Sequence, residues 1–509
     1  MENDHRQLAK GVLVNVLGML AKASRPLFLI IFSRILGAEK FGLYMLAFAT
    51  QEIVSKLAAL GLDMGITRLV GRLLAQGRKD DVRAVVQKTL MVGVGTSGVV
   101  ALALGLLADP VSRLILGTER LGSPLRNFCW GMPAVCATTM ILYSIRPTLR
   151  MQFELYVRSV VEPLLILVLG ILALHLDLGV QGLSFAHNIA ALAAMVLAWV
   201  FFLKIYPAKK GPLANVNWKL LWNTGVPMGA NELLNTFKNR LDVMVIGRFM
   251  SLTNVGIYSA VLEIGSVLRK LRATVDPVLM PMAQAHHERA DTVRLNRNLS
   301  LALRWVMIPS MALFGVMLVV PQVFLRFFGE AFEPGSAALR IMAGGQLVCV
   351  TLGLLEGVLL MVGYAYVPLI NSAVMIGLNL LLLRFMVPRW GLEGAAWATC
   401  ISFTVIALWR LDQARRLVGA RPFEKGQLKP ILAFFISCGI TGLVMVWTHP
   451  TSLVSQIGMA LFFILIYTAA MLSLPIEERD RDILRQVRER LPKSIGAARK
   501  WISTRIKGN

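Results

Sequence analysis

Charged residues are scarce in this chain. Asp, Glu, Lys and Arg make up 16% of its 509 residues, whereas soluble domains carry about 25%. Long polar stretches are also missing, because none between residue 10 and residue 474 exceeds about 30 residues. These two absences exclude a secreted, fibrous or ordinary cytosolic protein. The apolar runs are continuous and do not alternate with polar residues, which excludes a membrane β-barrel.

Cysteine is rare, and the motifs of catalysis are absent. The five cysteines show no CxxC or Cys/His spacing, so we expect no metal site, no redox site and no cofactor. The sequence contains no GxxxxGK[ST], HExxH or GxSxG. The longest loop expected outside the cytoplasm, about 109–123, holds few of the acids and arginines that a membrane glycosyltransferase would need. The chain is therefore predicted to be a conduit and not an enzyme.

Long apolar runs are abundant. Each has about 20 residues, the length that crosses the hydrocarbon core of a bilayer as a helix. They predict an all-α polytopic membrane protein with about 14 transmembrane helices. The approximate limits are 10–34, 41–62, 84–108, 124–146, 154–176, 180–204, 219–246, 252–280, 298–322, 336–361, 366–388, 392–415, 429–448 and 453–474.

Positive charge is in large excess, with 53 Lys and Arg against 29 Asp and Glu. Most of it lies in alternate loops, around 68–88, 204–219, 286–297 and 410–429. The positive-inside rule places these loops and both termini in the cytoplasm. An anionic lipid leaflet is then a simpler partner than nucleic acid. The segment 476–509 is predicted to be a basic amphipathic helix on the inner leaflet, or a solvated tail that sets orientation.

The sequence contains an internal repeat. Arg34–Tyr44 matches Arg248–Tyr258 at an offset of 214, and Gly179–Gly182 matches Gly391–Gly394 at an offset of 212. Two matches at nearly one offset indicate duplication of a six-helix unit, although similar use of Gly and Tyr at helix starts is an alternative. An even-numbered unit repeats in the same orientation. We therefore expect a six-helix lobe at 1–210, a second in parallel pseudo-repeat at 211–420, two further helices at 421–475 and the tail at 476–509.

Ionisable side chains inside the predicted spans are candidates for function, because each costs several kcal/mol unless it faces protein or water. Spacings of three, four and seven residues gather several of them on single helix faces. The candidate substrate-binding cations of a cavity between the lobes are Lys22, Arg25, Lys56, Arg158, Lys238 and Lys270. The acids, candidates for ion coupling or for structural pairing, are Glu52, Glu162, Glu232, Asp242, Glu263 and Glu356.

A cavity lined by these cations would complement an anionic cargo such as a phosphate or pyrophosphate. The alternative is that the charges only pair with one another and help helices pack. Glu52 with Lys56, and Arg158 with Glu162, have the i,i+4 spacing for such pairs.

Several motifs, taken in order, resemble those of a known family. The chain is similar to bacterial polysaccharide-type flippases of the multidrug/oligosaccharidyl-lipid/polysaccharide export superfamily over about residues 10–474. The motifs that carry the resemblance are Phe32–Tyr44, Gly61–Gly65 with Arg68, Phe237–Arg248, Val255–Tyr258 and Gly391–Ala398.

The resemblance implies transport of undecaprenyl-pyrophosphate-linked oligosaccharides across the bacterial inner membrane for O-antigen, capsule or exopolysaccharide. It also implies alternating access around a cationic cavity. The expected partners are the anionic lipid-linked oligosaccharide, membrane lipids and, functionally, a polysaccharide polymerase and glycosyltransferases. A lipid II flippase, an ion-coupled exporter of drugs or small molecules, and a membrane scaffold or transferase remain alternatives.

Overall fold

The structure is a computed structural model that describes residues 2–115, 117–150, 152–207, 216–272, 276–289, 291–364, 366–450 and 452–473. Side chains are described from Pro26 onward within these ranges, except at 115, 277, 278, 280–282 and 285. The predicted tail at 476–509 lies outside the described residues.

The described residues form helices, without strands. The α-helices are α1 Glu2–Ala59, α2 Leu62–Ala75, α3 Lys79–Leu106, α4 Ala108–Pro110, α5 Gly122–Cys129, α6 Met132–Ile145, α7 Gln152–Glu154, α8 Glu162–His175, α9 Gly179–Ile205, α10 Trp218–Phe249, α11 Leu252–Arg272, α12 Asp276–Glu288, α13 Thr292–Val319, α14 Pro321–Arg326, α15 Ser336–Met361, α16 Tyr366–Val418, α17 Leu428–Thr448 and α18 Leu453–Ser473. Short 3₁₀ or π turns are η1 Val111–Ile115, η2 Glu119–Leu121, η3 Arg146–Thr148, η4 Leu155–Val161, η5 Glu330–Gly335 and η6 Lys425–Gln427.

Eight of the described helical segments are long and apolar enough to cross a membrane. A ninth is added if the pair Glu119–Cys129 and Met132–Thr148, bent by 46°, is one span. Helices α1, α10 and α11 are not among them. Helices α10 and α11 are rich in charged residues. The predicted all-helical fold is confirmed, while the count of 14 spans stays a prediction.

Two of the longest helices are kinked at a glycine. Helix α1 is broken at Gly37 (φ 72°) and α16 at Gly391 (φ 56°). A positive φ suits glycine, which has no Cβ to clash with the backbone. Each helix thus contains two of the predicted segments, 10–34 and 41–62 in α1 and 366–388 and 392–415 in α16.

The predicted loop at 68–88 is wrong in part, because α2 extends through Ala75 and α3 begins at Lys79. Leu62, Ile66, Leu69 and Leu73 are buried on one face of α2. Their spacing of three and four residues is that of an amphipathic helix. The arginines on the other face of α2 are the residues that made the segment look like a loop.

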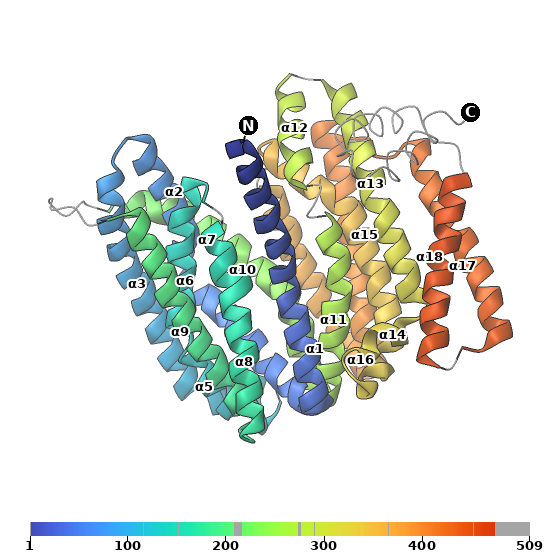
Figure 1. Ribbon diagram of the computed structural model, residues 1–509, viewed down its shortest axis with the longest axis horizontal. Helices are drawn as coiled ribbons and strands as arrows, with labels where there is room; N and C mark the ends of the chain where they lie inside the picture. Colours follow the sequence, from blue (N-terminus) through green and yellow to red (C-terminus); the bar gives the residue numbers. More distant parts are fainter. Residues whose placement is uncertain are drawn as a thin grey trace.

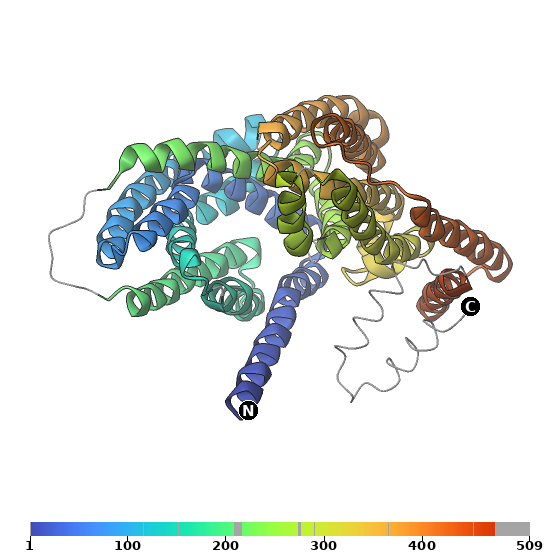
Figure 2. The same ribbon diagram turned by 90° about the horizontal axis from the view of Figure 1, so that it is seen from above.

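The helices form two groups that meet at α1 (Figure 1). Helices α2–α9 lie on the left of that view and α11–α18 on the right, with the first part of α1 between them. Helix α10 packs along α2 and also contacts α1 and α16, so it runs across the first group, as the view from above shows (Figure 2). Helices α17 and α18 pack against α13 at the outer edge. Helices α1, α10 and α11 are therefore the elements on which contacts between the groups depend.

The repeat-related glycines Gly42 and Gly256 meet at this junction. A Cβ on Gly42 would lie 1.9 Å from the carbonyl oxygen of Leu252, and a Cβ on Gly256 would lie 2.0 Å from that of Ala38. Ala38 and Leu252 are themselves 214 positions apart, so the contact is the same when the two halves are exchanged. This reciprocity supports the predicted duplication, while the lobe limits at 210 and 420 stay a prediction.

A second contact joins the halves at the end of the molecule opposite the N-terminus (Figure 1). Arg34 donates from Nε to the carbonyl oxygen of Phe327 (2.8 Å) and from Nη2 to that of Arg326 (2.9 Å). Ser33 Oγ donates to the carbonyl oxygen of Phe328 at 3.0 Å. These hydrogen bonds connect α1 to the last residue of α14 and to the two residues that follow it.

Candidate functional site

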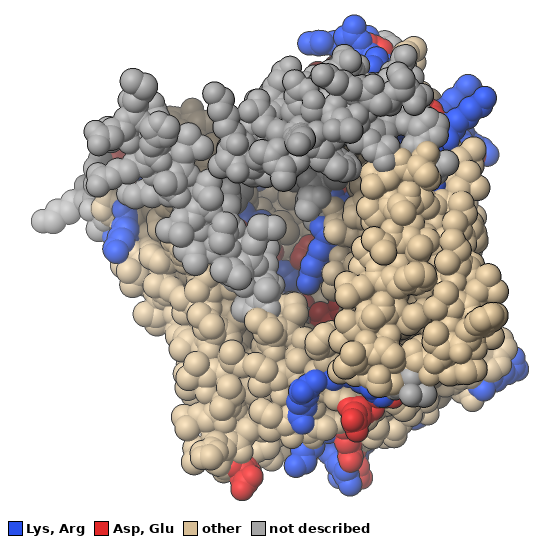
Figure 3. Space-filling model, turned by 45° about the vertical axis from the view of Figure 1, so that its right-hand side comes forward, with Lys and Arg blue, Asp and Glu red and all other residues tan. Residues whose placement is uncertain are grey.

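Two cavities, each of about 440 Å³, adjoin at the second part of α1. This volume falls in the range of about 300–1,000 Å³ found for small-molecule sites. The first, the aromatic cavity, is lined by residues of α1, α6, η4, α8 and α9. The second, the basic cavity, is lined by residues of α1, α10, α11, α15 and α16. Glu52 and Lys56 line both, and charged side chains are visible in a hollow between apolar surfaces in Figure 3.

The basic cavity gathers charged side chains from both halves of the chain. Five cations and four carboxylates line it: Lys56, Lys238, Arg240, Arg269 and Lys270, with Glu52, Glu232, Asp242 and Glu263. Most of the predicted site residues are thus brought together here. Arg158 and Glu162 line the aromatic cavity instead. Lys22 and Arg25 lie on α1, but their side chains fall outside those described.

Ion pairs in the basic cavity link α1 to α10. Arg240 Nε donates to Glu52 Oε2 at 2.7 Å, and its Nη1 lies 4.0 Å from Glu263 Oε1. Lys56 Nζ lies 3.4 Å from Glu232 Oε1 and 3.8 Å from Asp63 Oδ2. Their spacing predicted that Glu52 and Lys56 pair with each other along α1. The structure shows that each has a partner on α10.

Three cations of the basic cavity have no acidic partner within 4.0 Å among the described side chains. They are Lys238 on α10 and the adjacent Arg269 and Lys270 near the end of α11. The Nζ of Lys238 donates only to the neutral Oδ1 of Asn235, at 3.0 Å. Glu356 and Glu263 act on Lys238 and Arg269 only from beyond 4.0 Å. Cations without a close carboxylate are costly away from bulk water, so this part of the cavity is suited to an anionic ligand.

Asp242 is a buried carboxylate held by neutral donors. It accepts hydrogen bonds from Tyr258 Oη (3.2 Å), Asn379 Nδ2 (2.8 Å) and Thr399 Oγ1 (2.7 Å). These donors come from α11 and α16, so the carboxylate joins three helices of the second half. A carboxylate without a cationic partner within 4.0 Å in the described part of the chain is a reasonable place for a proton or another cation to act.

Glu356, on α15, is not among the described residues that line either cavity. Its Oε2 lies 3.2 Å from Nη2 of Arg410, whose side chain is buried. Its geometry is that of a structural ion pair, one of the two roles that the sequence left open.

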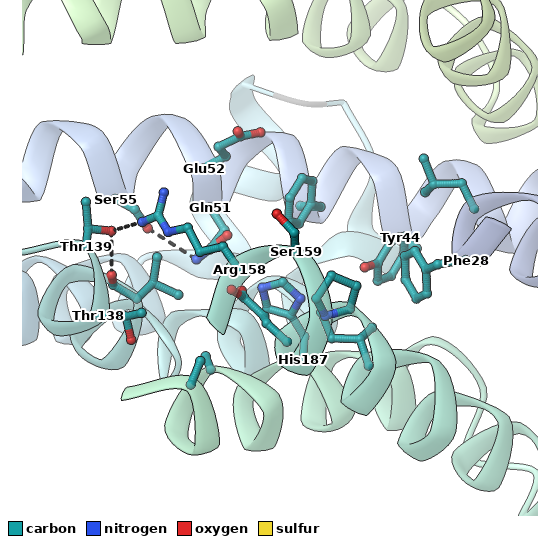
Figure 4. Close-up of a pocket in the computed structure, with 18 of the residues that line it drawn as sticks. Phe28, Tyr44, Gln51, Glu52, Ser55, Thr138, Thr139, Arg158, Ser159 and His187 are labelled. Atoms are coloured by element: carbon teal, nitrogen blue, oxygen red, sulfur yellow. Dashed lines mark hydrogen bonds between the residues drawn. The ribbon is translucent and has the colours of Figure 1, made fainter. Parts of the chain in front are cut away.

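The aromatic cavity is shown in Figure 4. Rings of Phe28, Tyr44, Phe48 and His187 line it beside several hydroxyl and amide groups. Arg158 Nη2 donates to Thr139 Oγ1 at the edge of this cavity.

Arg240 and Arg269 were missed by sequence reasoning. Glu232, Thr236 and Arg240 are spaced by four residues and all line the basic cavity. Ser266 and Arg269 follow the same rule at a spacing of three. A wider polar face on each helix, including residues three and four positions from Thr236 and Ser266, would have contained both arginines.

The chain is similar in structure to solved membrane transporters. It matches the lipid II flippase MurJ in an inward closed conformation with a TM-score of 0.73 at 13% identity, over 90% of this chain and 98% of that chain. It matches a multidrug resistance MATE family transporter of the MOP superfamily, inward-facing, with a TM-score of 0.68 at 14% identity, over 78% and 94%. At such identities these likenesses show the fold alone.

Two relatives are similar in sequence. A probable low-salt glycan biosynthesis flippase, Agl15, of Haloferax volcanii is 24% identical over 388 residues, which cover 74% of this chain and 76% of the relative. An uncharacterized membrane protein, EpsK, of Bacillus subtilis is 21% identical over 331 residues, which cover 62% of this chain and 63% of that protein.

The fold is one that membrane transporters have. The matching family and the relative named a flippase identify the class as a multi-pass membrane transporter and not an enzyme. Residues 8–285, more than half of the chain, match the model of the polysaccharide biosynthesis protein family. The chain belongs to that family, and the resemblance stated from the motifs is confirmed.

Proposed function

We propose that this protein moves an undecaprenyl-pyrophosphate-linked oligosaccharide from the cytoplasmic to the outer leaflet of the bacterial inner membrane. The observation that carries the proposal is the set of three cations, Lys238, Arg269 and Lys270, which have no acidic partner within 4.0 Å among the described side chains. Like charges on neighbouring side chains repel one another, and a pyrophosphate relieves this repulsion while accepting charge-assisted hydrogen bonds. Lys56 extends the positive wall toward the aromatic cavity.

The same cavity suits transport by alternating access. Arg240–Glu52 and Lys56–Glu232 are ion pairs between the two halves, and such pairs exchange partners when a charged cargo enters. In this proposal Glu52, Glu232 and Glu263 hold the cations in place while the cavity is empty. Movement of the predicted lobes, 1–210 and 211–420, then exposes the cavity to one side and afterwards to the other. Lys22, Arg25 and Arg158 remain proposed cargo contacts at the side of α1 and η4.

Charge removal in the basic cavity tests the proposal. Lys238→Gln and Lys270→Gln, combined, are expected to reduce flipping of the pyrophosphate-linked lipid in proteoliposomes at least tenfold, since each charge-assisted bond contributes about 1.5–3 kcal/mol. Surface polysaccharide display in cells should fall in parallel. Lys40→Gln, on an exposed position of α1, is the matched control and should flip normally. Full flipping by an inserted, folded double variant would refute the proposal.

Buried Asp242 favours a second candidate, an ion-coupled exporter of drugs or small molecules. Its neutral hydrogen-bond donors leave the carboxylate charge for a coupling cation to neutralise. Small-molecule efflux that stops when the ion gradient is removed, and that fails in Asp242→Asn while polysaccharide display continues, would select this candidate over the first.

A further inference from the structure

The aromatic cavity differs in chemistry from the basic cavity beside it. Tyr44 and Phe48 are one turn apart on α1, with ring planes 10° apart and centroids 6.3 Å apart. The His187 ring lies edge-on to Phe48, with centroids 5.6 Å apart. These three rings are in contact with one another and line the cavity from α1 and α9; Tyr44 and His187 are labelled in Figure 4. Flat aromatic faces of this kind suit the C–H face of a pyranose ring, through dispersion and weak C–H contacts.

The remaining lining is rich in groups that both donate and accept hydrogen bonds. Gln51, Ser55, Thr138, Thr139 and Ser159 come from three separate elements, α1, α6 and η4. Hydroxyls and amides match the hydroxyls of a sugar, which also do both. The hydroxyls of Thr138 and Thr139 donate to the carbonyl oxygens of Ala134 and Val135, at 2.8 Å each, and a hydroxyl oxygen that donates can still accept a hydrogen bond from a sugar hydroxyl.

The charges of the aromatic cavity balance. Two cations, Lys56 and Arg158, and two carboxylates, Glu52 and Glu162, line it. The basic cavity, by contrast, holds five cations against four carboxylates, and three of its cations have no acidic partner within 4.0 Å among the side chains that the structure describes. An anion is therefore drawn to the basic cavity, whereas a neutral polyhydroxyl compound fits the aromatic one.

The two cavities share a wall, because Glu52 and Lys56 line both. A single ligand with an anionic group joined to a polar uncharged group can thus occupy both at once. In such a ligand the anionic part lies against α10 and α11, and the uncharged part lies between α1, η4 and α9.

We propose that the aromatic cavity is a saccharide subsite, which binds the sugar next to the pyrophosphate of the cargo. This inference rests on the proposed function of the basic cavity. It divides recognition between the two halves of the chain. The second half binds the pyrophosphate through charge, and the first half binds the sugar through ring faces and hydroxyl groups.

Binding measurements on the purified full chain test the subsite. The probes are undecaprenyl pyrophosphate alone and a panel of its conjugates with a single glucosyl, galactosyl or N-acetylhexosaminyl group. At least one conjugate is expected to bind the unaltered protein about tenfold more tightly than the sugar-free lipid. Phe48→Leu with Ser159→Ala should remove most of this difference and leave the affinity for the sugar-free lipid unchanged. Lys238→Gln should instead weaken both probes by the same factor.

The matched control is Phe435→Leu, because Phe435 is an exposed phenylalanine of α17 far along the chain from both cavities. It should keep both affinities. Equal affinities of the unaltered protein for all probes would overturn the saccharide subsite while leaving the proposed flippase intact. A failure of the unaltered protein to bind any probe would overturn the proposed function itself. Equal losses for both probes in the Phe48→Leu variant would assign that residue a structural role and overturn the subsite.

Discussion

At the scale of single residues, Arg240 lies close to three other side chains. Its guanidinium pairs with Glu52, lies 4.0 Å from Glu263 and stands 5.3 Å from the centre of the Phe48 ring. The sequence predicted the cavity charges on either side of Arg240, because they interrupt apolar helices. It could not predict which of them pair, since the partners lie on α1, α10 and α11 and depend on how these helices cross. Pairing along one helix was the only pairing visible in the spacing.

The Arg240–Glu52 pair leads to a prediction for stability. Arg240→Gln leaves Glu52 without its 2.7 Å partner, and the free energy of unfolding should fall by about 1–3 kcal/mol, less than for a fully buried pair because Glu52 is partly exposed. Exchanging the charges, with Arg240→Glu and Glu52→Arg together, should recover part of this loss. Thermal unfolding followed by intrinsic fluorescence measures both.

Arg78→Gln is the comparison, because the Arg78–Asp81 pair lies at the surface, where the Arg78 side chain is 52% exposed. It should cost less than about 1 kcal/mol. Equal stability of Arg240→Gln and the unaltered protein would show that water replaces the guanidinium without cost.

At the scale of elements, helix positions follow from the apolar runs, and helix contacts do not. The runs predicted the segments of α3, α9, α13 and α18 closely because each contains an apolar stretch of at least 18 residues with at most two charged residues. They missed α2, where Arg68 and Arg72 suggested a loop although Leu62, Ile66 and Leu69 bury one face. The close approach of α1 and α11 was suggested only by the repeated glycines.

A methyl group at this approach should disturb it. Gly256→Ala places a Cβ 2.0 Å from a backbone carbonyl oxygen of α1, which cannot move without separating the helices. We expect a loss of about 1–3 kcal/mol in the free energy of unfolding, together with slower transport. Thermal unfolding and flipping in proteoliposomes are the measurements.

Gly98→Ala is the matched control for this prediction, because a Cβ there would meet nothing within 4 Å. It should be neutral or slightly stabilising, since alanine favours a helix over glycine. Gly42→Ala should reproduce the effect of Gly256→Ala, because its Cβ would meet Leu252 in the same way. A harmless Gly42→Ala would contradict the reciprocal contact.

At the scale of the whole molecule, the halves are joined at the end opposite the N-terminus. Ser33 and Arg34 of α1 bond there to three consecutive carbonyl groups, those of Arg326, Phe327 and Phe328. The predicted orientation puts this end outside the cytoplasm, and we propose that these bonds close the outer side. The local sequence does not predict these hydrogen bonds, because every residue has a backbone carbonyl oxygen that can accept one.

A cross-link at this end should stop transport. In a variant without the five native cysteines, Arg34→Cys and Phe327→Cys, both at exposed positions, should be joined through disulfides by a short bis-methanethiosulfonate reagent, since the Arg34 side chain reaches the carbonyl oxygen of Phe327. Flipping in proteoliposomes should then fall to background and return when a reductant is added. Each single cysteine is the control. Undiminished flipping by the fully cross-linked protein would mean that the halves need not part at this end.

The reciprocal contact of Gly42 with Gly256 also bears on how such a chain could arise. Each glycine faces the carbonyl that corresponds to the one facing its counterpart, which is the arrangement of an isologous dimer interface. Before any gene fusion, one glycine in a half-length ancestor would have met its own copy across a two-fold axis. After such a fusion the two copies would be free to diverge. One half could then acquire aromatic side chains and the other lysines and arginines, while the contact between the halves was kept.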